Sequence, residues 1–123
     1  MSQIRILVVD DSPFIHKAIT RALNTTEGYE VCGIAKNGKE GVDQYASLKP
    51  DMVTMDITMP IMDGLEAATA IMTQDPSAKI MMLSAMGDEE LIANAKAIGV
   101  QHFLQKPFKN DEFVAAIQSI YRG

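Results

Sequence analysis

Five residues with reactive side chains directly follow or close short apolar runs of this sequence: Asp10, Asp11, Asp56, Ser84 and Lys106. Asp56 closes the run at 52–56, and Pro60 and the Asp63-Gly64 pair then start a turn. This pattern places Asp56 at the carboxyl end of a strand, where ligands bind in open α/β sheets. Taken alone, Asp56 is more simply explained as the cap of a following helix. The other strand ends, which also carry reactive groups, favour a functional site.

The three carboxylates predict a cation site if they meet at one crevice. Neighbouring carboxylates repel each other unless a cation neutralises them. Oxygen-only ligands select a hard ion, Mg²⁺ or Mn²⁺, over zinc. We expect Asp11 to bind this ion directly and Asp10 to bind it partly through water. Two acids here would repel a bare phosphate, and the sequence has no Walker-type glycine–lysine loop, so a phosphoryl group needs a bridging metal.

A hydroxyl and an ammonium end the last two apolar runs. Beside the crevice, Ser84 and Lys106 are suitable donors to phosphoryl oxygens. Taken alone, Ser84 is equally well explained as a turn residue, and Lys106 is better explained as a solvated loop lysine. Together with the acids, they make Asp56 the candidate nucleophile. Its carboxylate would attack a phosphoryl group in line and give an acyl phosphate.

Strands and helices are predicted to alternate strictly along the chain. The apolar runs predict strands at 4–9, 30–35, 52–56, 79–83 and 100–105. Helices with apolar residues at helical spacing follow each run, the last at about 110–121. Alternation implies a parallel sheet with helices on both faces. Five strands suit the flavodoxin-like order 2-1-3-4-5, which brings Asp10, Asp11 and Asp56 together at its switch point.

Composition and charge narrow the class of protein. The chain has 123 residues, 47% of them apolar, which predicts a single domain over residues 1–123. A net charge of −5 argues against a nucleic acid partner and points to cations or to a basic protein surface. The sequence lacks a membrane-spanning run and a signal-peptide pattern, and it has one cysteine, Cys32. We therefore expect a cytoplasmic protein with no membrane partner.

These residues together resemble the receiver domain of two-component response regulators. The resemblance covers the whole chain and rests on four stretches: Asp10-Asp11, Asp56 with Met59-Pro60-Ile61-Met62-Asp63-Gly64, Ser84-Ala85, and Lys106-Pro107-Phe108. The residues at 55–60 and 84–87 are similar to those of stand-alone chemotaxis members. Chemotaxis receivers are themselves known examples of the strand order 2-1-3-4-5.

The resemblance implies a role for each residue of the site. Asp56 accepts a phosphoryl group from the phosphohistidine of a CheA-like histidine kinase. The Mg²⁺ ligands are three carboxylates and one backbone carbonyl: Asp10, Asp11, Asp56 and Thr58. Ser84 and Lys106 then contact the phosphoryl group. The protein has no enzyme activity beyond phosphorylating itself from a phosphodonor and dephosphorylating itself.

The resemblance also implies a switch. Phe103 matches the switch aromatic of the family, a position at which Tyr is frequent. Phosphorylation draws the Ser84 hydroxyl inward and lets the Phe103 ring turn into the vacated space. The face formed by the fourth helix, fifth strand and fifth helix is remodelled for a partner such as a flagellar motor switch protein. We expect a monomer or a weak, phosphorylation-dependent dimer.

Two pairs of residues near the site complete these expectations. In the family, the positions of Thr58 and Met86 flank the phosphoryl site and influence how a hydrolytic water is placed. Met59 and Met62 belong to the loop after Asp56. We expect both methionines to be exposed and to line a contact with the kinase.

Two other readings of the sequence remain open. The chain could be a receiver cut from a longer regulator with a DNA-binding or methylesterase output domain. It could also be a metal-dependent phosphatase of the haloacid-dehalogenase type, which uses an Asp nucleophile, Mg²⁺, a Ser or Thr and a Lys. That family places its nucleophile after the first strand in an Asp-x-Asp pattern. The adjacent Asp10-Asp11 pair and the lack of room for a cap domain argue against it.

Overall fold

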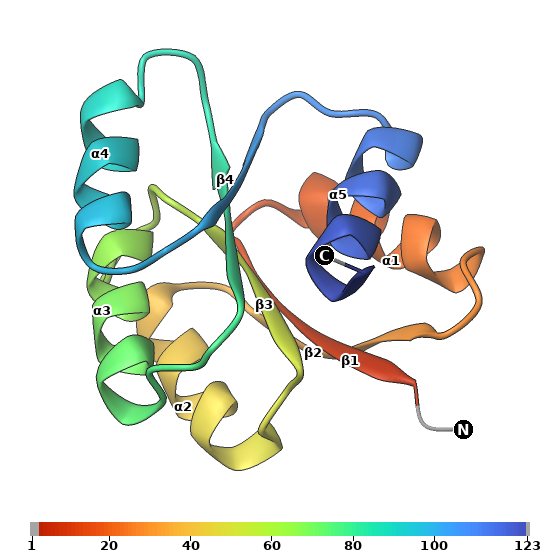
Figure 1. The fold of residues 1–123 in the computed structure, drawn as a ribbon, viewed down its shortest axis with the longest axis horizontal. Helices are drawn as coiled ribbons and strands as arrows, with labels where there is room; N and C mark the ends of the chain where they lie inside the picture. Colours follow the sequence, from red (N-terminus) through yellow and green to blue (C-terminus); the bar gives the residue numbers. More distant parts are fainter. Residues whose placement is uncertain (1–2, 123) are drawn as a thin grey trace.

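The computed structural model of the chain describes residues 3–122, and the side chains of residues 3–120. Strands and helices alternate along the chain, as the sequence predicts (Figure 1). The strands are β1 (Ile4–Val9), β2 (Tyr29–Ala35), β3 (Met52–Asp56), β4 (Ile80–Ser84) and β5 (His102–Gln105). The helices are α1 (Pro13–Asn24), α2 (Gly38–Leu48), α3 (Gly64–Gln74), α4 (Glu89–Ala97) and α5 (Asn110–Arg122).

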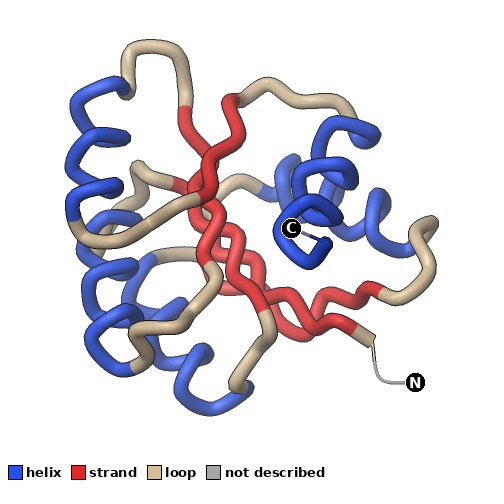
Figure 2. The backbone as a smooth tube through the Cα atoms, viewed as in Figure 1, coloured by secondary structure: helices blue, strands red, loops and turns tan. Residues whose placement is uncertain are grey.

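The strands form one parallel sheet in the order β2-β1-β3-β4-β5, which confirms the predicted topology (Figure 2). Val9 of β1 pairs with Met55 of β3. The next residue of each strand is an acid, so Asp10 and Asp56 reach the same edge of the sheet side by side. The strand order reverses between β1 and β3, and the predicted crevice lies at this switch point.

Helices cover both faces of the sheet, with α1 and α5 on one side and α2, α3 and α4 on the other (Figure 1). Side chains alternate between the two faces along each strand. In β3, Met52 packs with residues of α1 and α5, whereas Val53 and Met55 pack with residues of α2, α3 and α4. Burial on both faces explains why the strands read as continuous apolar runs.

The fifth strand starts at His102, two residues later than the sequence predicts. The reason is the way α4 ends. Gly99, at φ 108°, donates its N–H to the Lys96 carbonyl at 3.1 Å, and the Val100 N–H donates to the Ala95 carbonyl at 3.1 Å. These two bonds form a Schellman cap. Because Val100 uses its N–H for the cap, it does not join the sheet.

Caps start three of the helices close to the strand ends. The side chains of Ser12, Asn37 and Asp63 each accept a hydrogen bond from a backbone N–H in the first turn of the following helix. In α3, Glu66 returns the bond to the Asp63 N–H and completes a capping box. Short, capped connections hold the loops that carry the candidate site. Among the helices of residues 3–122, none has the length and hydropathy of a membrane span.

Candidate functional site

Three carboxylates meet at the carboxyl edge of the sheet. One ligand oxygen from each of Asp10, Asp11 and Asp56 lies within 4.8 Å of the others. Asp10 is fully buried and Asp56 is 9% exposed, whereas Asp11 is exposed to solvent. The predicted convergence of these residues is confirmed. A cluster of this kind has one solvent-facing side from which a ligand can approach.

Lys106 reaches into this cluster from the end of β5. Its Nζ donates to Asp10 Oδ2 at 3.0 Å and lies 3.4 Å from Asp56 Oδ1. Its backbone N–H donates to the carbonyl of Ser84 at 2.6 Å, and the Lys106–Pro107 peptide is cis. Lys106 is therefore not the solvated loop lysine of the simpler explanation. Its single positive charge faces two of the three carboxylates.

The charge balance of the cluster changes the acidity of Asp56. Burial raises the pKa of the Asp56 carboxyl from 3.8 to about 6, and the neighbouring Asp10 carboxylate adds to the rise. Lys106 and the Thr58 N–H, which donates to Asp56 Oδ1 at 3.4 Å, lower this pKa but do not offset the burial. One ammonium thus neutralises the cluster incompletely. Oxygen donors with surplus negative charge fit a hard divalent cation.

The backbone around Asp10 orients its side chain. The Ser12 N–H donates to Asp10 Oδ1 at 2.9 Å. His16 Nε2 donates a hydrogen bond to the Asp10 carbonyl oxygen. His16 is not among the site residues that the sequence predicts. Its place one turn after the Ser12 cap is the one signal that could have linked it to the site.

Comparison with known proteins identifies the family. Residues 6–118 match the family model of the response regulator receiver domain. The chain belongs to this family. The receiver domain is 45% identical to the chemotaxis protein CheY of Thermotoga maritima over 116 residues, 94% of this chain and 96% of that protein. The predicted family is confirmed.

One solved structure is similar in fold, and one longer protein is similar in sequence over part of its length. A chain of the CheX–CheY–BeF₃–Mg²⁺ complex from Borrelia burgdorferi superposes with a TM-score of 0.90 and 34% identity, covering 98% of this chain and 90% of that one. The protein-glutamate methylesterase of Idiomarina loihiensis is 41% identical over 122 residues, 94% of this chain but 31% of that protein. The first match confirms the predicted fold class.

Two more predicted residues of the receiver domain, Ser84 and Phe103, lie on the two strands that follow β3 in the sheet. Ser84 ends β4, next to the residue that pairs with Asp56, and is 3% exposed. No hydrogen bond among the described residues joins its hydroxyl to the carboxylates. Phe103 lies on β5 beside Met82 and is half-buried, with the Lys96 Nζ 5.7 Å from its ring centroid. The structure thus places Ser84 between the cluster and the strand that carries Phe103.

The expectation for the two loop methionines is wrong. Met59 is buried and Met62 is half-buried, and both pack into the core between the sheet and the helices α2 and α3. The reason is a long-range bond, because the Gly38 N–H donates to the Met62 carbonyl at 2.9 Å and holds the loop against the start of α2. Exposed apolar residues that follow the strand ends of the site are instead Phe14, Ile61 and Met86.

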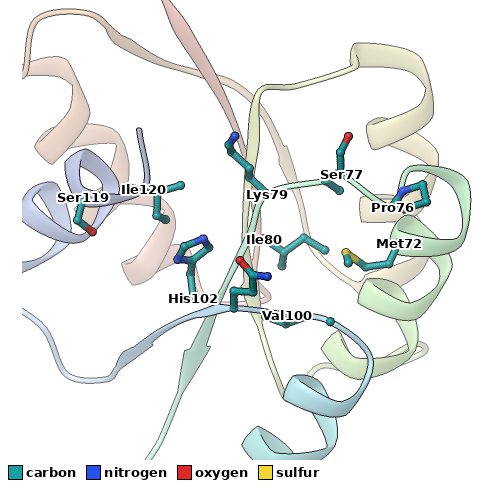
Figure 3. A pocket seen from close by; sticks show the side chains of 12 residues that line it. Met72, Pro76, Ser77, Lys79, Ile80, Val100, His102, Ser119 and Ile120 are labelled. Atoms are coloured by element: carbon teal, nitrogen blue, oxygen red, sulfur yellow. The ribbon is translucent and has the colours of Figure 1, made fainter. Parts of the chain in front are cut away.

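A separate cavity of about 450 Å³ lies at the opposite edge of the sheet (Figure 3). Its walls come from the end of α3, the amino ends of β4 and β5, and α5, and they include Met72, His102 and Ile120. Burial and the nearby Lys79 ammonium lower the pKa of His102, which is therefore mostly neutral at pH 7. None of the five predicted site residues lines this cavity. The candidate chemistry belongs to the carboxylate edge.

Proposed function

We propose that this receiver domain is a chemotaxis response regulator whose Asp56 accepts a phosphoryl group from the phosphohistidine of a CheA-like histidine kinase. One observation carries the proposal. The Asp56 carboxylate lies within 4.8 Å of the other two carboxylates and 3.4 Å from the Lys106 ammonium. A carboxylate in these surroundings can act as a nucleophile, while the Lys106 ammonium and a cation held by the carboxylates would offset the charge of the phosphoryl group. Similarity to chemotaxis proteins over most of the chain supports the biological role.

In the transfer, an oxygen of the Asp56 carboxylate attacks phosphorus in line with the P–N bond of the phosphohistidine. The O–P bond forms as the N–P bond breaks. The electron pair of the broken bond stays on the imidazole nitrogen, which takes up a proton from solvent. The product is an acyl phosphate on Asp56. Lys106 and Ser84 donate hydrogen bonds to the oxygens of the new phosphoryl group.

The carboxylate cluster fits Mg²⁺, with Mn²⁺ as an alternative, because it offers hard oxygen donors and surplus negative charge. The ligands would be the three carboxylates and one backbone carbonyl: Asp10, Asp11, Asp56 and Thr58. When bound, the ion supplies positive charge to the phosphoryl oxygens. The bond from the Ser12 N–H orients Asp10 for this role. Exposed Asp11 is the ligand closest to solvent.

Phosphorylation would switch the surface formed by α4, β5 and α5. The Ser84 hydroxyl moves toward the phosphoryl group, and the Phe103 ring turns into the space that Ser84 leaves. Half-buried Phe103 lies on β5, which pairs with the strand that ends at Ser84, and the Lys96 ammonium of α4 is 5.7 Å from its ring centroid; this arrangement supports the path. The output partner is a protein such as a flagellar motor switch component, which binds the remodelled surface.

The same proposal covers the extent of the domain, its location, its oligomeric state and its own phosphorylation chemistry. Residues 1–123 act as one cytoplasmic receiver domain, a monomer or a weak phosphorylation-dependent dimer, that phosphorylates itself from small phosphodonors and dephosphorylates itself. A receiver of a longer regulator is the second candidate. For that candidate, the similarity to a methylesterase, of which this chain covers 31%, favours a methylesterase output domain over a DNA-binding one.

Intact-mass measurement tests the proposed acceptor. Wild-type protein incubated with acetyl phosphate and Mg²⁺ should gain the mass of one phosphoryl group. Asp56→Asn or EDTA should abolish the gain, and Lys106→Met should slow it at least about tenfold. Lys109→Met, which changes an exposed lysine three positions further on, is the matched control and should behave as wild type. An unchanged gain in Asp56→Asn would refute the assignment of the acceptor.

A further inference from the structure

Exposed apolar side chains follow three of the strand ends that form the candidate site. Among the described residues, the exposed large apolar side chains are Phe14, Ile34, Ile61 and Met86, at 85%, 39%, 80% and 85% exposure. Three of them follow site residues closely. Phe14 comes four positions after Asp10, Ile61 five after Asp56 and Met86 two after Ser84. We call Phe14, Ile61 and Met86 the apolar rim.

Ile61 has an unfavourable backbone conformation. Its φ is 70°, and the Met62 N–H donates to the Pro60 carbonyl at 2.7 Å. This bond makes Ile61 the central residue of a γ-turn, which is strained in its positive-φ form. A β-branched residue at positive φ is an outlier, whereas Gly or Asn adopts this conformation more readily. The turn therefore favours a different residue type at position 61.

The rest of the loop explains why the backbone holds this conformation. The Gly38 N–H binds the Met62 carbonyl at 2.9 Å, and the Gly64 N–H binds the Ile57 carbonyl at 2.8 Å. The first bond attaches the loop to the start of α2, and the second joins the two ends of the loop. The Ile61 side chain points into solvent and adds little to the core, so neither the turn nor the packing accounts for an isoleucine. Strain retained at an exposed residue beside a reactive centre indicates a role in recognition.

We propose that Ile61 is a specificity-determining contact for the phosphohistidine-bearing domain that delivers the phosphoryl group to Asp56. This inference rests on the proposed function. In-line transfer requires the phosphorus atom to approach Asp56 to about 3 Å, so a protein donor has to lie on the loops around the crevice. Those loops carry Ile61 and Met86, and Phe14 lies in the first turn of α1. The donor surface that surrounds the phosphohistidine therefore has apolar side chains that cover Ile61, with Phe14 and Met86 at its margins.

A small phosphodonor does not cover the loops, which gives a direct test. Phosphorylation rates are measured for wild type and Ile61→Gly with two donors, acetyl phosphate and the phosphorylated histidine domain of the CheA-type kinase from the source organism. Ile61→Gly should change the acetyl phosphate rate less than about twofold. Its kcat/KM with the kinase domain should fall about tenfold or more, mainly through KM, because an apolar contact of this size is lost.

Further variants separate contact from loop flexibility. Ile61→Asn suits the positive φ but is polar, so its kcat/KM with the kinase domain should fall as much as that of Ile61→Gly. Ile61→Leu should retain most of the wild-type rate with the kinase domain. Ile34→Ala, an exposed apolar residue on β2, is the matched control and should leave both rates unchanged. Thermal unfolding of each variant verifies that the fold is retained.

Different outcomes would overturn the Ile61 contact and the proposed phosphorylation of Asp56. Equal kinase rates in wild type and Ile61→Gly would overturn the proposed contact, and so would equal losses with both donors. Weaker binding of a phosphatase or output protein with unchanged kinase transfer would assign the rim to that partner and overturn it as well. If acetyl phosphate fails to phosphorylate the wild type at Asp56, the proposed function itself is wrong.

Discussion

Asp56 carries its charge in surroundings that favour the neutral acid. Burial and the Asp10 carboxylate raise its pKa from 3.8 to about 6, so the folded protein binds a proton on Asp56 more tightly than the unfolded chain does. The stability gained from this proton is fully present below about pH 4 and is lost as the pH rises through about 6. Without metal, the charged carboxylate therefore destabilises the fold at neutral pH.

Replacing this charge should stabilise the metal-free protein. Asp56→Asn should raise the free energy of unfolding by about 1–2 kcal/mol at about pH 7, less than the full pKa shift because solvent screens part of it. The gain should shrink as the pH falls and vanish below about pH 3, where Asp56 is protonated in both the folded and unfolded states. Urea unfolding over this pH range measures the difference.

A surface carboxylate provides the comparison for this prediction. Asp43 of α2 is exposed, and its carboxylate lies 3.6 Å from the Lys39 ammonium. Asp43→Asn should change the free energy of unfolding by about 0.5 kcal/mol or less. A gain in Asp56→Asn that is the same at both ends of the pH range would show that burial does not raise the pKa of Asp56.

At the level of the secondary-structure elements, α3 begins against the end of β3. A Cβ added at Gly64 would lie 2.1 Å from the backbone oxygen of Asp56. The capping box of Asp63 and Glu66 holds the first turn of the helix in this place. Glycine is therefore required here by contact, not by φ. The start of the helix sets the position of the strand end that carries Asp56.

This close approach predicts a large effect of one methyl group. Gly64→Ala should lower the free energy of unfolding by about 3 kcal/mol or more, because backbone has to shift to relieve the overlap. Gly87→Ala is the comparison, since Gly87 has φ 95° and open space around it. That change should lower stability by about 1–2 kcal/mol through strain alone. Equal effects in the two variants, measured by urea unfolding, would contradict the role assigned to the contact.

On the scale of the whole molecule, the site exists only when the sheet is formed. Asp10 and Asp11 follow β1, Asp56 ends β3 and Lys106 follows β5. In the unfolded chain these residues are separated by long segments, so a divalent cation has no comparable site there. Cation binding should consequently favour the folded state.

Magnesium should therefore raise the thermal midpoint in a concentration-dependent way. At ten times the dissociation constant the expected stabilisation is about 1.4 kcal/mol. The rise should be reversed by EDTA and weakened in Asp11→Asn, which removes one proposed ligand from an exposed position. Calorimetry with NaCl at matched ionic strength is the control. An equal rise in NaCl would indicate screening of surface charge and not a specific site.

Local patterns in the sequence were enough to predict the alternating elements, the parallel sheet and the edge at which the acids meet. Apolar spacing and caps such as Ser12 depend on residues a few positions apart, so the chain reveals them directly. The parallel order then requires that Asp10 and Asp56 leave the sheet at the same edge. The family resemblance added a role for each of the five site residues.

Contacts between distant segments decided the rest. The pKa of Asp56 depends on how deeply the folded sheet buries it and on Asp10, which is far away in the sequence. The bond between Gly38 and Met62 turns the loop so that Met59 is buried and Ile61 is exposed, whereas the sequence predicts that Met59 and Met62 are exposed. Side-chain direction in a loop follows from what holds its backbone, and here the anchoring atoms lie on another connection of the fold.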